Sequence, residues 1–215
     1  MENLLINILL SVLLGITIFI ALLRKKILKA EEILIPMIAG LCAVFPASLL
    51  EYLLSIKTSY LTGLFKTFIN AFIIASFMEE TAKFLVIKAL FYIRKIDDLK
   101  TGIATAVAVG TGFACLENIM YSFDSSIIVM FRVFTAIPIH IITAGIIGYF
   151  CVKSNPSNRG IRGFGEAFLI HGFYNLFISL RSFISFFAMP LLLWAGYRLY
   201  RLTKNDALKN STDTE

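Results

Sequence analysis

Charged residues are scarce in this chain of 215 residues, because aspartate, glutamate, lysine and arginine make up only 16% of it. In a soluble domain about a quarter of the residues are charged. Hydrophobic residues make up 58% of the chain and the mean hydropathy is +0.82. This composition excludes an ordinary soluble protein and predicts that the lipid bilayer is the solvent.

Cysteine is also rare, and it lacks the spacing of a metal site or of a disulfide framework. Cys42, Cys115 and Cys151 lie within or at the edge of apolar stretches, and no two of them form C-x-x-C. We therefore interpret them as small buried hydrophobic residues. The net charge of +6 is divided among short clusters between apolar runs rather than along one face, which argues against nucleic acid as a partner.

Seven apolar runs follow one another along the chain. A bilayer crossing needs about 20 apolar residues and an open backbone is not viable in lipid, so each run predicts a helix. The predicted fold class is all-α, a polytopic transmembrane bundle of about seven helices. Near Arg181 and Ser182 the connection is so short that the last two runs form either a tight hairpin or one broken helix. The runs span about residues 4–23, 33–56, 64–93, 102–123, 127–152, 162–181 and 183–200.

No basic residue precedes the first run, which argues against a cleaved signal peptide and predicts a retained first helix. Basic clusters follow runs one, three, five and seven, and such clusters stay cytoplasmic. The N-terminus is therefore predicted outside and the C-terminus in the cytoplasm. We expect one membrane domain over residues 1–203 and a disordered cytoplasmic tail over 204–215. The clusters are Arg24-Lys25-Lys26-Lys29, Arg94-Lys95-Lys100, Lys153-Arg159-Arg162 and Arg198-Arg201-Lys204-Lys209.

Two acids and a lysine lie midway along the third run. A charged side chain at the bilayer centre costs about 2.5 to 3.5 kcal/mol, so such residues usually face the bundle interior and mark function. Lys83 follows Glu79 by four residues and Glu80 by three, so one ammonium group can contact both acids. This pattern alone is compatible with a buried ion pair that holds helices together. The uncompensated second carboxyl favours a general acid or base.

The fourth run contains a second polar group, Glu117 with Asn118. Phe113 shares a helical face with Glu117, and Gly110 and Gly112 lie a turn or so earlier, where a neighbouring backbone could approach closely. A purely structural role, in which Glu117 forms a hydrogen bond to another helix, explains this segment equally simply.

Both histidines of the chain lie in later apolar runs. His140 follows Pro138 by two residues, and proline bends a helix and opens room for water or a ligand. His171 and Asn175 are four residues apart, on the same helical face, with Gly172 leaving space beside the imidazole. Such a pair can bind one ligand together, or it can be a satisfied pair in the core.

Four helices thus each bring a titratable group near the middle of the membrane. If they converge, carboxylates and imidazoles surround one polar cavity and can activate water for hydrolysis. The same groups can bind a divalent metal such as zinc and leave a position open for water. The sequence leaves both possibilities, water alone or a metal, open.

The four segments, in this order, resemble the motifs of the PrsW family of bacterial membrane proteases, relatives of the CAAX prenyl-protease and bacteriocin-processing group. The resemblance covers about residues 64–180. The matching motifs are Glu79-Glu80-x-x-Lys83, Phe113-x-x-x-Glu117-Asn118, His140 and His171-x-x-x-Asn175.

The resemblance implies an endopeptidase of the bacterial cell membrane whose substrate is a single-pass membrane protein, typically an anti-sigma factor cut at site 1 during envelope stress. By analogy with the CAAX proteases, Glu79 would be the general base, Glu80 and Lys83 its electrostatic partners, His171 a water-positioning or metal-binding group and Asn175 the oxyanion donor. The second motif ends in Glu117, where that of the CAAX proteases ends in histidine.

The predicted site therefore has catalytic, supporting and metal-binding candidates. The catalytic candidates are Glu79, Glu80, Glu117, His140 and His171. The supporting candidates are Lys83, Phe113, Asn118 and Asn175. The candidate metal ligands are Glu79, Glu117, His140 and His171.

Two other classes of protein use charged residues in membrane helices. A proton- or ion-coupled transporter is the main alternative, but transporters often contain paired repeats, and neither E-E-x-x-K nor H-x-x-x-N has a second copy. In a purely structural protein the same groups would only lock helices together, and Glu79→Gln would harm folding more than activity.

Overall fold

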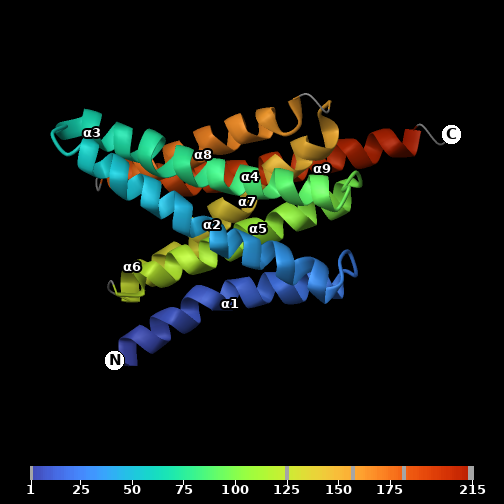
Figure 1. Ribbon diagram of the computed structural model, residues 1–215, viewed down its shortest axis with the longest axis horizontal. Coiled ribbons are helices and arrows are strands. Elements are labelled where there is room, and N and C mark those ends of the chain that lie inside the picture. The colour runs from blue at the N-terminus through green and yellow to red at the C-terminus, as the bar shows by residue number, and fades with distance from the viewer. Residues whose placement is uncertain (1, 124–125, 156–157, 181–182, 213–215) are drawn as a thin grey trace.

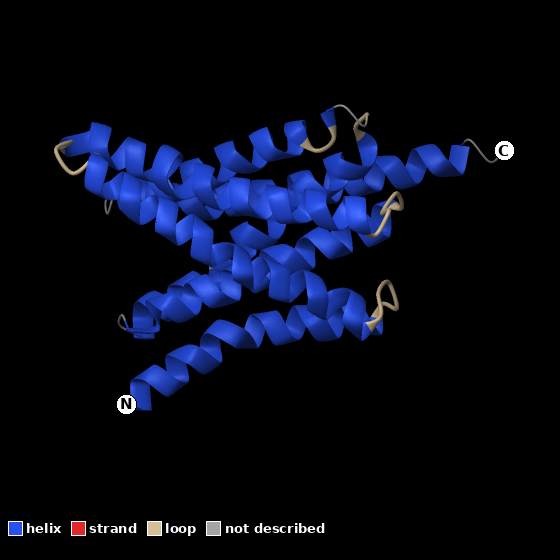
Figure 2. Ribbon diagram, in the orientation of Figure 1, coloured by secondary structure: helices blue, strands red, loops and turns tan. Residues whose placement is uncertain are grey.

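The chain folds into a bundle of helices, as the computed structural model in Figures 1 and 2 shows. It describes residues 2–123, 126–155, 158–180 and 183–212, and in these residues there is no strand. The predicted all-α bundle of about seven helices is confirmed for this part of the chain. The helices are α1 (Glu2–Arg24), α2 (Ala30–Lys57), α3 (Gly63–Ile69), the π-helix η1 (Asn70–Ser76), α4 (Phe77–Ile93), α5 (Leu99–Met120), the short η2 (Tyr121–Phe123), α6 (Ser126–Phe134), α7 (Ala136–Lys153), α8 (Ile161–Ser179), the short η4 (Phe183–Phe187) and α9 (Ala188–Thr212).

Five helical segments in the described part of the chain are long and apolar enough to cross a membrane. The continuous rod from α3 to α4 and helix α8 are not among them. Both carry the polar residues of the predicted site, which lower their hydropathy. These residues are tolerated because they point into the bundle, where other helices supply partners. The five segments are Leu4–Arg24, Ala30–Lys57, Leu99–Phe123, Ser126–Lys153 and Phe183–Asp206.

The segments that carry the basic clusters gather at one end of the bundle. In Figure 1 the C-terminal ends of α1, α4, α7 and α9 lie at this end, and the N-terminus lies at the opposite end. The connections α2–α3 and α5–α6 also lie at the end of the N-terminus. The predicted topology requires all the basic clusters at one end of the bundle, and the structure has this arrangement. Which end faces the cytoplasm stays a prediction.

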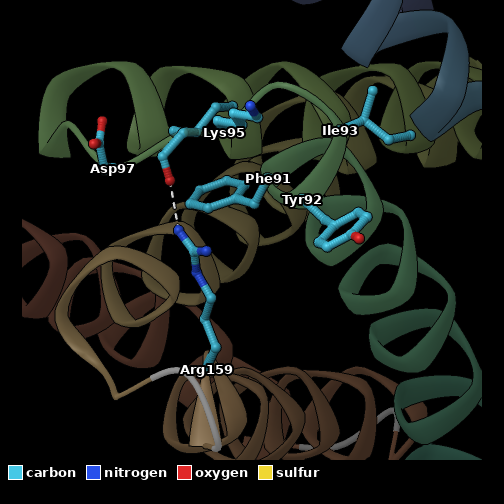
Figure 3. Close-up of a pocket in the computed structure, with 7 residues that line it drawn as sticks. Phe91, Tyr92, Ile93, Lys95, Asp97 and Arg159 are labelled. Atoms are coloured by element: carbon cyan, nitrogen blue, oxygen red, sulfur yellow. Dashed lines mark hydrogen bonds between the residues drawn. The ribbon is translucent and has the colours of Figure 1, made fainter.

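A cavity of about 550 Å³ lies at the basic end, beside the connection between α4 and α5 (Figure 3). Arg159 Nε donates a hydrogen bond to the Cys151 carbonyl at 2.7 Å, and the guanidinium group donates a second one to the Ile96 carbonyl. The arginine therefore ties the α4–α5 connection to the end of α7. The cavity lies at the C-terminal end of α4, whereas Glu79 lies near the start of that helix.

The last helix extends beyond residue 203, and the domain boundary expected there stays a prediction. Helix α9 continues to Thr212, because no glycine or proline interrupts the chain after Gly196. Asp206, which we expected in a disordered tail, is buried, and its carboxylate lies 2.5 Å from Lys153 Nζ. Arg181 and Ser182 lie outside the described residues, but α8 and α9 are two separate helices that pack against each other.

Helix α5 is the centre of the bundle and packs against both α2 and α7. A Cβ atom on Gly112 would overlap the Met37 carbonyl of α2, and one on Gly110 would lie 2.6 Å from the His140 carbonyl oxygen of α7. The close approach predicted from these two glycines is thus confirmed. Because α7 lies directly on α5, His140 reaches the polar end of α5.

Helix α8 packs against η1, the π-helical turn that precedes the two adjacent glutamates. A Cβ atom on Gly172 would collide with the Phe72 ring, so this glycine lets the two segments touch. Ser76 Oγ donates a hydrogen bond to the Phe168 carbonyl at 2.8 Å. π-helical turns change the direction of the side chains that follow them and are frequent at functional sites. This contact brings His171 to the α4 glutamates.

We expect Gly112→Ala to destabilise the protein by about 1–3 kcal/mol, because a methyl group forces α2 away from α5. Thermal unfolding of the purified protein in detergent measures the effect. Gly165→Ala is the matched control, since no atom lies within 4 Å of the position that its Cβ would take. Equal melting temperatures for the two variants would contradict the close packing of α2 on α5.

Candidate active site

His171 of α8 is held by Glu80 of α4. The Nδ1 atom of His171 lies 2.7 Å from Glu80 Oε1, and both side chains are buried. An ionised carboxylate only accepts hydrogen bonds, so Nδ1 carries the hydrogen and the lone pair is on Nε2. This Nε2 atom lies 3.9 Å from Glu79 Oε2.

His140 of α7 is oriented in the same way by Glu117 of α5. Its Nε2 atom lies 2.6 Å from Glu117 Oε2, so we assign the hydrogen to Nε2 and the lone pair to Nδ1. This Nδ1 atom lies 3.7 Å from Glu79 Oε2. The Phe113 ring packs against the imidazole, with 5.4 Å between the ring centroids. Each histidine therefore has one nitrogen toward a supporting acid and the other toward Glu79.

Lys83 compensates the negative charge of Glu80. Its Nζ atom donates to Glu80 Oε1 at 2.6 Å, and both side chains are completely buried. Nζ also lies 3.0 Å from His140 Nδ1 and 3.4 Å from Thr143 Oγ1. Thr143 Oγ1 donates to Glu80 Oε1 at 3.2 Å. Buried charges need such partners. In this network all the partners contact Glu80 Oε1, whereas Glu80 Oε2, like Glu79 Oε2, has no hydrogen-bond partner among the described residues.

Glu79 is 6% exposed, and among the described residues its Oε2 atom has no hydrogen-bond partner. A buried carboxylate oxygen without a partner is costly and needs an explanation. Glu79, His140 and His171 each offer one ligand atom, and these atoms lie within 4.8 Å of one another. One carboxylate with two neutral imidazoles is a known donor set of catalytic zinc, whose ligands lie roughly 3.3 Å apart. The three residues therefore fit a divalent metal ion.

A metal ion and Lys83 would use the same lone pair of His140. The 3.0 Å contact between Lys83 Nζ and His140 Nδ1 has to open when Nδ1 becomes a ligand. Lys83 keeps its bond to Glu80 and its neighbour Thr143 in that case. Glu80 and Glu117 then act as the outer carboxylates that fix the orientation of metal-binding histidines.

The two oxygens of Glu117 contact Arg132 and His140, and Glu117 lies outside this three-residue group. Arg132 of α6 donates to Glu117 Oε1 at 2.6 Å and, through Nε, to Asn118 Oδ1 at 3.1 Å. The guanidinium group also lies over the Tyr121 ring, 3.7 Å from its centroid. Asn118 Nδ2 donates to Ser11 Oγ of α1 at 3.0 Å. Glu117 is thus a support for His140 that is itself held by Arg132.

The structure brings together most of the residues that the sequence predicts for the site. Asn118 contacts the site only through Arg132. Asn175, one turn beyond His171, is half-buried and makes no hydrogen bond within the described part of the chain. The residues that meet are Glu79, Glu80, Lys83, Phe113, Glu117, His140 and His171.

The sequence analysis missed three residues near the site. Arg132 lies within the fifth apolar run, on α6. Thr143 follows His140 by three residues and therefore shares its helical face. Glu51 is an acid within the second apolar run, and it interacts electrostatically with Glu79 and Glu117. Candidate site residues are selected as charged residues at membrane depth. Arg132 and Glu51 meet this criterion, so it would have identified both.

A buried Glu-His-His group inside a bundle of membrane helices has the donor set of a metal-dependent hydrolase, and it fits the class of membrane-embedded hydrolases. Comparison with known proteins identifies the family. The chain belongs to the PrsW family: the family model described as "PrsW family intramembrane metalloprotease" matches residues 29–197.

Relatives with the name Protease PrsW extend this match over most of the chain. The chain is 31% identical over 195 residues to that of Oceanobacillus iheyensis, which covers 85% of this chain and 89% of the relative. The protein of Bacillus subtilis is 26% identical over 170 residues, or 74% and 76% of the two chains. That of Geobacillus kaustophilus is 25% identical over 178 residues, or 78% and 77%. No solved structure matches the chain.

The protein is therefore a multi-pass protease of the bacterial cell membrane. The predicted family and enzyme class are confirmed, and the transporter alternative is not favoured.

We expect Arg132→Ala to lower the rate of cleavage about 10- to 100-fold, because Glu117 loses the partner that holds it against His140. Measurements of kcat/KM with purified protein, at equal metal content, test this. Arg132→Lys should recover part of the activity, because lysine keeps the positive charge but lacks the several N–H donors of the planar guanidinium group. Arg201→Ala, at an exposed position on α9, is the control. Native kcat/KM in Arg132→Ala would remove Arg132 from the support of the site.

Proposed function

We propose that this protease makes the first cut in a single-pass membrane anti-sigma factor, with Glu79, His140 and His171 holding a divalent metal ion at the hydrolytic centre. One observation carries the assignment of the centre. The unpartnered Oε2 atom of Glu79 lies between the two imidazole nitrogens that are not used by the supporting acids. The substrate assignment rests on the resemblance to the PrsW family.

The chain's own residues have distinct roles in this proposal. Glu80 and Glu117 hold the two imidazoles so that their lone pairs converge near Glu79. Lys83 and Thr143 keep Glu80 as an anion, so the carboxylate left for the reaction is Glu79. Its Oε2 atom would bind the metal ion, and its other oxygen would accept a proton from water. A metal ion bound there would supply Lewis acidity that polarises water or the scissile carbonyl group.

Asn175 is the proposed donor to the oxyanion. It follows His171 by one helical turn, and its amide is not engaged by other described residues. An amide donor that is already in place costs little reorganisation when charge develops on the carbonyl oxygen of the substrate.

The depth of the centre supports a first cut outside the cytoplasm. Glu117 lies near the C-terminal end of α5, and His140 lies near the N-terminal end of α7. These helix ends lie away from the basic end of the bundle (Figure 1). With the predicted orientation, the centre lies in the outer half of the membrane, where it reaches the outer end of a substrate helix.

We expect Glu79→Gln to fold normally and to lose cleavage by about 100-fold or more, because it removes the proposed proton acceptor. The assay is cleavage of a co-reconstituted single-pass anti-sigma factor, with mass spectrometry of the fragments. Glu166→Gln is a matched control, since Glu166 pairs with Arg198 on another part of α8. A Glu79→Gln protein that cleaves at the native rate, or that fails to fold, would contradict the proposed role.

We expect about one divalent metal ion per chain in the purified protein and much less in His140→Ala and His171→Ala, because each variant loses a ligand. Elemental analysis measures this directly. Removal of the metal with a chelator should abolish cleavage, and its return should restore it. Full activity of protein that elemental analysis shows to be free of metal would favour catalysis by Glu79 alone.

A further inference from the structure

An apolar groove of about 220 Å³ lies between α2 and α4. Helix α2 contributes small and apolar side chains, and α4 contributes a stripe that includes one hydroxyl group. The residues that line it are Ala43, Pro46, Ala47, Leu50, Met78, Thr81, Ala82, Leu85 and Val86. The volume is below the roughly 300–1,000 Å³ of sites for drug-sized ligands, so the groove fits one or two side chains rather than a free small molecule.

The groove starts beside the acids of the hydrolytic centre. Leu50 directly precedes Glu51 on α2, and Met78 directly precedes Glu79 on α4. From there the groove follows both helices toward the basic end of the bundle, as far as Ala43 and Val86. A ligand in the groove therefore lies next to Glu79, on the side of Glu79 that faces the membrane interior.

One polar side chain of the groove lacks a partner. Thr81 Oγ1 is buried and makes no hydrogen bond to other described residues. An extended peptide offers both N–H and C=O groups, whereas a lipid acyl chain offers neither. The groove thus suits a peptide segment better than a lipid tail.

We infer that this groove binds an apolar side chain of the substrate's transmembrane segment, on the membrane-interior side of the scissile bond, and that Thr81 forms a hydrogen bond to the substrate backbone. The inference rests on the proposed function, because it requires Glu79 to mark the point of cleavage. Thr81 is then a residue for substrate binding, and Ala82 keeps the groove open.

The Thr81→Val variant distinguishes a role of Thr81 in substrate binding from a structural role. Removal of a buried hydroxyl group without a partner should keep or raise the melting temperature. Loss of a hydrogen bond to the substrate should lower kcat/KM roughly three- to ten-fold, mainly through KM. Unchanged kcat/KM in a stable Thr81→Val protein would overturn the role of Thr81.

Ala82→Leu tests whether the groove must be open. It should reduce cleavage of a substrate with a large apolar residue beside the scissile bond at least ten-fold, and much less when that residue is alanine. Ala89→Leu, at an exposed position of the same helix outside the groove, should leave both rates unchanged. Equal effects of Ala82→Leu on both substrates would overturn the assignment of the groove.

Photo-crosslinking tests occupancy without cleavage. A photoreactive residue at Leu50 in the Glu79→Gln protein should crosslink to a co-reconstituted single-pass anti-sigma factor, whereas one at Leu49, which does not line the groove, should not. The adduct should disappear with excess unlabelled substrate. A phospholipid adduct alone at Leu50 would overturn the inference. Because the assay needs no catalysis, a crosslink at Leu50 would support the groove even if Glu79 proved not to be the proton acceptor.

Discussion

The pairing of Lys83 with Glu80 is the interaction on which the centre of this protein depends. Both side chains are completely buried, and an ionised group in such a position is tolerated only with a partner of opposite charge. Lys83 contacts Glu80 and not the neighbouring Glu79, whose Oε2 atom lies 3.7 Å from His140 Nδ1 and 3.9 Å from His171 Nε2. One ion pair thus gives two adjacent glutamates different surroundings.

Close packing of the helices brings these glutamates together with residues of the other helices. Gly112 admits α2, Gly110 admits α7, and Gly172 admits the Phe72 ring of η1. In lipid there is little hydrophobic drive between helices, so small residues and interhelical hydrogen bonds decide which faces meet. These contacts place titratable groups from α4, α5, α7 and α8 around the same point.

The support of the site extends beyond the region matched by the family model, which starts at residue 29. Ser11 of α1 accepts a hydrogen bond from Asn118, Asn118 accepts one from Arg132, and Arg132 holds Glu117. The first helix, which is mostly exposed and is attached to the bundle at few buried positions, is thereby linked to His140. The position of the His140 imidazole therefore depends on contacts among α1, α5, α6 and α7.

The sequence by itself determined the fold class, the bundle of about seven helices and the residue types of the centre, because apolar runs and charges at membrane depth leave few alternatives in a bilayer. It could not assign partners to Glu79 and Glu80, which are equivalent neighbours along the chain. Only the tertiary structure shows that Glu80 contacts Lys83 and His171, that Glu117 contacts His140, and that Arg132 and Thr143 lie beside these residues. The physical reason is that hydrogen bonds between helices depend on rotation and close approach, and neither is encoded in the spacing along one helix.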